Sequence, residues 1–169
     1  MKRFFPFALS TLILAASGFT QSRMLPIDTT VVTEHEVTVK GTRFAYRATA
    51  GTQPVWDEGG KPIASLYYTF YERLGIENNG ERPLVISFNG GPGSASVWMH
   101  VAYTGPKILN IDSEGYPVQP YGVRENPHSI LDVADIVFVN PVNTGYSRIV
   151  QGKGEKPVDK LSLIHISEP

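Results

Sequence analysis

The sequence predicts an α/β fold built on an incomplete, mixed and mostly parallel sheet that begins with an antiparallel pair of strands. Two early segments alternate apolar and polar residues, as half-exposed antiparallel strands do. Two later runs, 83–88 and 134–139, are almost entirely apolar, as the buried strands of a parallel sheet are. Only one helix candidate accompanies them, at 97–103, whereas parallel neighbours need a crossover between each pair. The set of elements is therefore incomplete.

The first residues of the chain, 1–22, are predicted to be a secretory signal peptide. Lys2 and Arg3 precede the apolar run Phe4–Leu14, and small residues follow it. We therefore expect a secreted or periplasmic protein without stable membrane association after cleavage. An uncleaved membrane anchor is the alternative, although Ser, Thr and Gln dilute the apolar run.

The remaining elements are expected within one domain, residues 27–160. The antiparallel pair turns at Lys40-Gly41, and its second strand runs into a loop rich in Gly, Pro and acidic residues. The strand at 83–88 is expected to be central and covered on both faces. In chain order, we predict strands at 29–39, 42–50, 63–71, 83–88, 108–111 and 134–139, with long loops at 52–61 and 114–126.

Composition excludes several classes of function. Apolar residues make up 41% of the chain, so it can build a core, and the net charge of −1 argues against nucleic acid as a partner. The chain has no cysteine, which excludes disulfides and thiolate metal sites. The four histidines are scattered without H-E-x-x-H spacing, so we expect no metal and no cofactor.

The most informative stretch is the glycine loop, Asn89–Ser96, which connects the apolar run 83–88 to the helix candidate. Its three glycines and one proline let backbone N–H groups point outward, which suits negative charge. Phosphate binding is the weaker interpretation, because neither Gly-Lys-Ser/Thr nor G-x-G-x-x-G is present. Stabilisation of an oxyanion during acyl transfer is the stronger one. A tight turn without chemistry is the structural alternative.

The loop resembles the oxyanion loop of the serine carboxypeptidase family, and a second segment supports the likeness. Residues 126–147 resemble the family's other amino-terminal signature, an Asn–Ser–Leu segment, an Ala-Asp strand and then Pro-x-x-Thr-Gly-aromatic-Ser. Gly105-Pro106 also matches the family, and residues 48–68 look closest to its bacterial branch. The resemblance covers about residues 37–148. It implies the amino-terminal part of an α/β-hydrolase fold.

The resemblance also implies roles for three loop residues. Gly91 matches the position whose N–H faces the oxyanion, and Asn89 and Gly90 match those that bind the terminal carboxylate of a peptide substrate with a free C-terminus. Asn89 could instead close an Asx turn. Tyr103 stands where the family commonly has Glu, which puts exopeptidase specificity in doubt.

Five further residues receive predictions of lesser weight. Asn140 replaces the usual Asp and removes a charge, and Asn143 replaces Gly, which Asn tolerates in left-handed geometry. We expect Trp98 to serve packing and His100 to lie on a helix face. Asp135, at a strand start, is assigned to structure.

The catalytic serine, acid and base are missing from the sequence. No G-x-S-x-G elbow occurs, and neither Ser94 nor Ser147 has the right neighbours. The resemblance places the family's nucleophile, Asp and His beyond residue 169. The terminal residues 161–169 are expected to be a non-native or disordered tail.

We therefore expect an inactive fragment of a secreted serine-type carboxypeptidase, which cleaves peptides through an acyl-enzyme. The alternatives are an esterase or acyltransferase of the same fold, or a non-catalytic carboxylate-binding module.

Overall fold

The computed structural model describes residues 25–77, 79–89 and 93–150. The predicted signal peptide and the predicted tail at 161–169 lie outside these ranges. Within them, no helix has both the length and the apolarity required to cross a bilayer.

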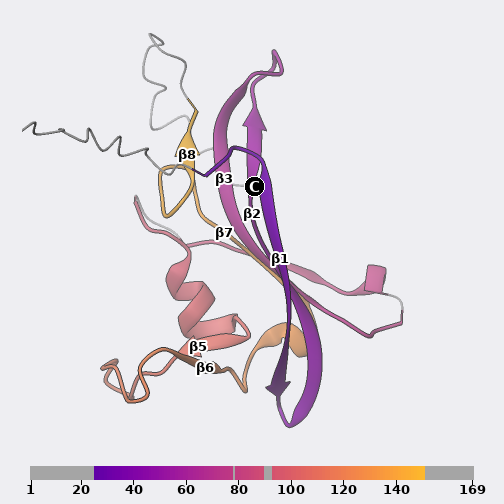
Figure 1. The fold of residues 1–169 in the computed structure, drawn as a ribbon, viewed down its shortest axis with the longest axis vertical. Coiled ribbons are helices and arrows are strands. Elements are labelled where there is room, and N and C mark those ends of the chain that lie inside the picture. The colour runs from indigo at the N-terminus through magenta and orange to yellow at the C-terminus, as the bar shows by residue number, and fades with distance from the viewer. Residues whose placement is uncertain (1–24, 78, 90–92, 151–169) are drawn as a thin grey trace, which may run out of the picture.

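A mixed sheet organises the described chain, with the order β1-β2-β3-β7-β4 and with β8 paired to β3 (Figure 1). Only β4 and β7 are parallel neighbours within the described residues, and the other pairs are antiparallel. The predicted mixed sheet with an antiparallel beginning is confirmed, whereas the expectation that the sheet is mostly parallel is wrong for the described residues. The sheet strands are β1 (Thr29–Val39), β2 (Thr42–Trp56), β3 (Pro62–Arg73), β4 (Leu84–Ser87), β7 (Asp135–Val139) and β8 (Arg148–Ile149).

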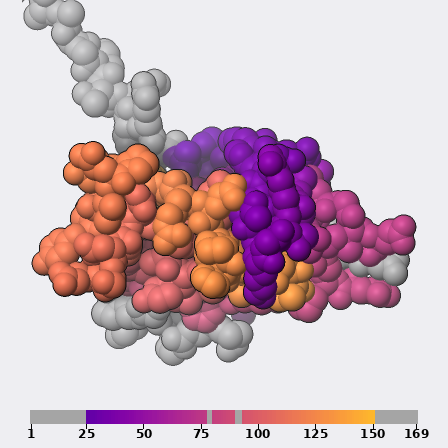
Figure 2. Space-filling model, turned by 90° about the horizontal axis from the view of Figure 1, so that it is seen from below, coloured from indigo at the N-terminus to yellow at the C-terminus, as the bar shows by residue number. Residues whose placement is uncertain are grey.

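The connections contain short helices and a separate hairpin. β5 (Lys107–Leu109) pairs with β6 (Val123–Glu125) in a two-stranded sheet. This hairpin and the helix η2 (Met99–Thr104) lie on one side of the main sheet, and the connection that carries η1 (Asn79–Glu81) extends on the other (Figure 1). Figure 2 shows the chain around β5 and β6, in orange, gathered at one end of the molecule. The third short helix, η3 (Ile130–Asp132), precedes β7.

Two expected loops contain strand. β2 continues to Trp56, although 52–61 is predicted as a loop because of Pro54. The last β1–β2 pair joins Thr29 to Thr52, so Pro54 lies past the end of β1 and its missing N–H costs no ladder bond on that side. In the second loop, residues 123–125 form β6 because they pair with β5.

The expectation of a central, covered strand at 83–88 is wrong for the described residues. β4 is the edge of the sheet, and Leu84 and Ile86 are 56% and 62% exposed. Val85 and Phe88 are exposed as well. The apolar run identifies a strand correctly, but it carries no information on whether a neighbour covers that strand.

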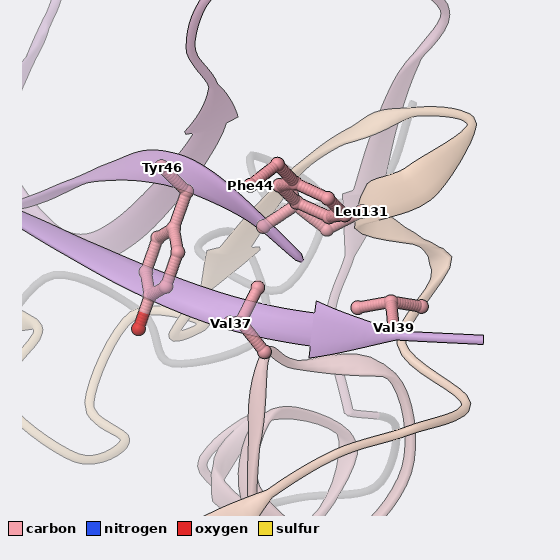
Figure 3. Close-up of a cluster of buried hydrophobic side chains, with 5 residues drawn as sticks. All are labelled: Val37, Val39, Phe44, Tyr46 and Leu131. Atoms are coloured by element: carbon pink, nitrogen blue, oxygen red, sulfur yellow. The ribbon is translucent and has the colours of Figure 1, made fainter. Parts of the chain in front are cut away.

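The hydrophobic core lies between the β1–β2 hairpin and η3. Five side chains form it, and Figure 3 shows them converging from both sides. Leu131 of η3 is fully buried against residues that alternate along the two strands, which explains the period-two pattern in the sequence. The cluster consists of Val37, Val39, Phe44, Tyr46 and Leu131.

Candidate functional site

The glycine loop begins where β4 ends, beside the end of β7. The parallel pairing of Ser87 with Phe138 brings the carboxyl ends of both strands to one edge of the sheet. Ligand sites in open α/β sheets form at this edge. Two of the three predicted site residues, Gly90 and Gly91, lie outside the described residues, whereas Asn89 is described. Gly93 has a φ of +82°, so the loop does use a conformation that favours glycine.

Asn89 spans the glycine loop. Its side-chain amide donates to Ser94 Oγ, and its backbone N–H donates to Ser96 Oγ at 3.1 Å. A carboxamide carries two N–H donors, and the contact with Ser94 uses one of them. The Asn89 side chain reaches Ser94, five residues along the chain, whereas the Gly91 N–H that the alternative Asx turn would use lies outside the described residues.

Ser96 connects the glycine loop to the end of β7. Its hydroxyl accepts the Asn89 N–H and donates to the carbonyl of Val139, and its own N–H donates to Asn140 Oδ1 at 3.0 Å. The Ser96 side chain is almost completely buried. The sequence does not predict these roles, since a serine at the end of a glycine loop gives no signal about a partner 44 residues away.

The segment 140–147 folds into tight turns that hold Asn140 in place. Asn140 donates its backbone N–H to Tyr67, and its carbonyl accepts from the fully buried Ser147 Oγ at 2.6 Å. Gly145 has a φ of +50°, and a Cβ there would lie 2.2 Å from the Asn140 amide nitrogen. Asn143 has a φ of 65°, which confirms that Asn fits the left-handed position.

The carboxyl end of η2 is closed by residues of the second segment. Asn126 donates its side-chain amide to the carbonyls of Tyr103 and Gly105 at 2.9 and 2.8 Å, and Ser129 Oγ donates to that of Thr104 at 3.0 Å. Asn126 and Ser129 are both buried. These bonds satisfy three consecutive carbonyls that the helix itself leaves free. In the sequence, Asn126 and Ser129 are marked only by their place in a segment that resembles a family signature, and that resemblance does not predict these hydrogen bonds.

His100 makes contacts that its expected place on a helix face does not predict. Its Nε2 lies 2.6 Å from the Tyr71 hydroxyl, and its ring stacks on Phe138 at a centroid distance of 4.6 Å. Burial lowers the pKa of His100 to about 4. Burial also raises the pKa of Tyr71, so the phenol stays protonated and donates to the neutral imidazole. His100 thus joins the helix after the loop to β3 and β7.

Three other predicted roles have clear outcomes. Asp135 is structural, as predicted, because its Oδ1 accepts from Arg82 Nε and from the Arg73 N–H, both at 3.1 Å. It lies at the start of β7, whereas the glycine loop meets the end. Trp98 does not serve packing, since its side chain is 56% exposed beside the loop. Tyr103, at the position of the usual Glu, is 64% exposed.

Comparisons with known proteins agree on one family. A family model described as serine carboxypeptidase matches residues 48–162. The pheromone-processing carboxypeptidase KEX1 of Saccharomyces cerevisiae is 33% identical over 100 residues, which are 57% of this chain and 12% of that protein. Serine carboxypeptidase-like 31 of Arabidopsis thaliana is 30% identical over 105 residues, or 61% of this chain and 19% of that protein.

A solved structure also matches this chain. The crystal structure of Kex1(delta)p, a prohormone-processing carboxypeptidase from Saccharomyces cerevisiae, is 30% identical with a TM-score of 0.43. The match covers 68% of this chain and 23% of that chain. The chain therefore spans less than a quarter of the length of each of these three relatives.

Proposed function

The chain belongs to the serine carboxypeptidase family, and on that premise we propose that it carries the oxyanion loop and the carboxylate-binding part of a serine-type carboxypeptidase. The substrate is a peptide with a free C-terminus, cleaved through an acyl-enzyme. We propose further that the parent protein is secreted and belongs to the bacterial branch, on the basis of residues 1–22 and 48–68.

One observation carries the proposal: the two family segments meet at the carboxyl ends of the parallel pair β4 and β7. Ser96 at the end of the glycine loop binds Val139 and Asn140, which lie within the second segment, at and just after the end of β7. A turn that served only to reverse the chain would not need a buried tie to a distant motif. The contact therefore supports a loop whose position matters for chemistry.

The proposed roles follow the chemistry of the loop residues. Gly91 offers its N–H to the oxyanion, and a donor of that kind contributes roughly 3–4 kcal/mol to transition-state stabilisation. Asn89 and the Gly90 N–H hold the terminal carboxylate of the substrate. The carboxamide suits this task because it donates without a counter-charge that would need desolvation. Tyr103, exposed on η2, offers a phenol where the family commonly has Glu.

We propose that the nucleophile, acid and base belong to polypeptide other than these 169 residues. No G-x-S-x-G is present, and Ser96 and Ser147 are buried with their hydroxyls donated to backbone carbonyls. The β4 edge supports the same idea: its N–H and C=O groups on the outer side meet no strand of the described chain, and its apolar side chains are exposed. A further strand would cover both.

The first experiment tests for catalysis. The purified 169-residue chain is incubated with a chromogenic ester of an N-blocked amino acid and with a fluorophosphonate probe. We expect neither turnover nor labelling. Turnover that the probe abolishes would overturn the assignment of the nucleophile to other polypeptide.

The second experiment tests carboxylate binding. Titration calorimetry compares an N-blocked dipeptide that has a free carboxylate with its C-terminal amide. We expect the acid to bind more tightly, and Asn89→Ala to weaken it about tenfold, because hydrogen bonds to charged groups contribute about 1.5–3 kcal/mol. Asn110→Ala is the matched control, since that amide donates to the Val118 and Pro120 carbonyls, away from the glycine loop. Equal binding of acid and amide would refute the carboxylate site.

Two alternatives share the loop and differ in what completes it. An esterase or acyltransferase would use the same oxyanion donor, and the exposed phenol at Tyr103 keeps this candidate open. A carboxylate-binding module would need no serine. Genomic sequence past codon 160 separates these classes: an in-frame G-x-S-x-G supports an enzyme, and a stop codon supports the module.

A further inference from the structure

We propose that Ser96 and Asn140 are positioning residues for the glycine loop, a role that deepens and rests on the proposed function. They hold the stem of the loop at a fixed place on the end of β7. Neither residue touches the substrate in this proposal. Both act by fixing the Asn89 backbone and the start of η2.

The hydroxyl of Ser96 closes the loop stem. Asn89 is two residues past the end of β4, and its N–H donates to Ser96 Oγ. The same hydroxyl donates to the carbonyl of Val139, the last residue of β7. A single buried oxygen therefore joins both ends of the loop to the sheet, and its donor and acceptor functions are both used.

Asn140 supplies a second tie from a rigid anchor. Its backbone is fixed on both sides, by the Tyr67 carbonyl at 2.9 Å and by Ser147 Oγ at 2.6 Å. Ser147 in turn accepts the Tyr67 N–H at 2.8 Å, so the anchor belongs to β3 as well. From this backbone the Asn140 side chain reaches the Ser96 N–H at 3.0 Å. Hydrogen bonds therefore connect the loop stem to two strands of the sheet, β3 and β7.

The family commonly has aspartate at the position of Asn140, and this substitution offers a test of the positioning role. Aspartate would present an acceptor oxygen to the Ser96 N–H, as the Asn140 carboxamide does. The positioning role therefore predicts that Asn140→Asp keeps the loop in place and that Asn140→Ala releases it. A role limited to packing predicts no such rescue by the charged variant.

The test measures local order and ligand binding separately. The variants are Ser96→Ala, Asn140→Ala and Asn140→Asp. The control is Ser129→Ala, which removes an equally buried hydroxyl that accepts Leu131 N–H and donates to the Thr104 carbonyl, away from the loop stem. Amide hydrogen exchange is followed residue by residue on the 169-residue chain. Binding of the N-blocked dipeptide acid is measured by titration calorimetry.

We expect Ser96→Ala and Asn140→Ala to speed exchange of the Asn89 and Ser96 amides at least tenfold beyond any change in the slowest amides of β2 and β3. Ser129→Ala should leave the exchange rates of the Asn89 and Ser96 amides unchanged relative to the slowest amides of β2 and β3. Asn140→Asp should give the same relative rates as the wild type. The dipeptide acid should bind about tenfold more weakly to the two alanine variants. If Ser96→Ala loses the far-UV circular dichroism of the wild type, the comparison of Asn140→Ala with Asn140→Asp decides.

The proposal would be overturned if exchange of the Asn89 and Ser96 amides in Ser96→Ala and Asn140→Ala increased only by the factor seen for the slowest amides of β2 and β3, as expected for Ser129→Ala. The proposed function fails separately, through a wild-type chain that binds the dipeptide acid and its amide equally. The exchange measurement then still decides whether Ser96 and Asn140 hold the loop.

Discussion

Replacing His100 should remove most of the loss in the free energy of unfolding that this buried histidine causes at acidic pH. The imidazole accepts from Tyr71 and stacks on Phe138, and burial lowers its pKa to about 4 from 6.5. In the unfolded chain the same group takes up a proton near its ordinary pKa. Between these two values the unfolded state binds more protons than the folded state, so stability falls as the pH falls.

The size of the effect follows from the width of that pH window. Each pKa unit corresponds to about 1.4 kcal/mol, so the shift of His100 amounts to about 3 kcal/mol across the window. This stabilisation is fully present above pH 6.5 and is lost on acidification toward pH 4. A domain's total stability is about 5–15 kcal/mol, so the loss is a large share of it.

The assay compares urea unfolding of the wild type and His100→Gln from pH 7.5 to pH 4. Glutamine retains an acceptor for the Tyr71 hydroxyl and does not titrate. Unfolding is followed by far-UV circular dichroism. We expect the difference in the free energy of unfolding between the two chains to shrink by about 3 kcal/mol over this range. Parallel pH profiles would show that His100 is not held neutral and would refute the reasoning.

The remaining predictions concern a close contact and a buried ion pair, both read from urea unfolding. Gly105→Ala should cost about 3 kcal/mol or more, because a Cβ there would lie 2.2 Å from a carbonyl oxygen of η2, whereas Gly80→Ala, with open space around it, should cost less than about 1 kcal/mol. A cost below that of Gly80→Ala would contradict the contact. Arg82→Met should cost about 3–5 kcal/mol, because it leaves Asp135 charged and buried. Arg43→Ala breaks an exposed pair and should cost less than about 1 kcal/mol, so equal costs would argue against the buried pair.

The sequence predicts the strands well where side-chain alternation meets a core. Val37 and Val39, and likewise Phe44 and Tyr46, occupy every second position of their strands, and the structure buries these four against Leu131. Periodicity of two records which face of a strand is covered, so it carries this information directly. The sequence does not predict the burial of Leu131, because a single apolar residue in a one-turn helix has no period.

The sequence fails where the deciding contact is distant or lies outside the chain's own pattern. Pro54 suggests a loop, yet it lies in β2. β1 extends only as far as the pair of Thr29 with Thr52, so no β1 residue needs an N–H from Pro54. The apolar run at β4 suggests a covered strand, yet nothing in a run of apolar residues specifies its neighbours. Trp98 suggests packing by its type, whereas its place next to the loop leaves it exposed.

The candidate site illustrates the same limit at the level of chemistry. Resemblance selects the glycine loop and the segment 126–147, but it does not say how they touch. The contacts fall to Ser96, Asn126, Ser129 and Ser147, small polar residues that are common in any loop. Their importance depends on burial, because a buried hydroxyl or amide must find partners and thereby fixes what it bonds to. Burial is a property of the fold and not of the local sequence.

The position of the glycine loop therefore depends on β3, β7 and the segment after β7. Ser96 and Asn140 bind the loop stem to the end of β7. Asn126 and Ser129 bind the carboxyl end of η2, the helix that follows the loop. All of these groups lie within residues 67–147, and none of them requires the exposed edge of β4. The contacts that hold the loop stem therefore lie on the β7 side of β4, and amide hydrogen exchange at Asn89 and Ser96 measures them without any catalytic assay.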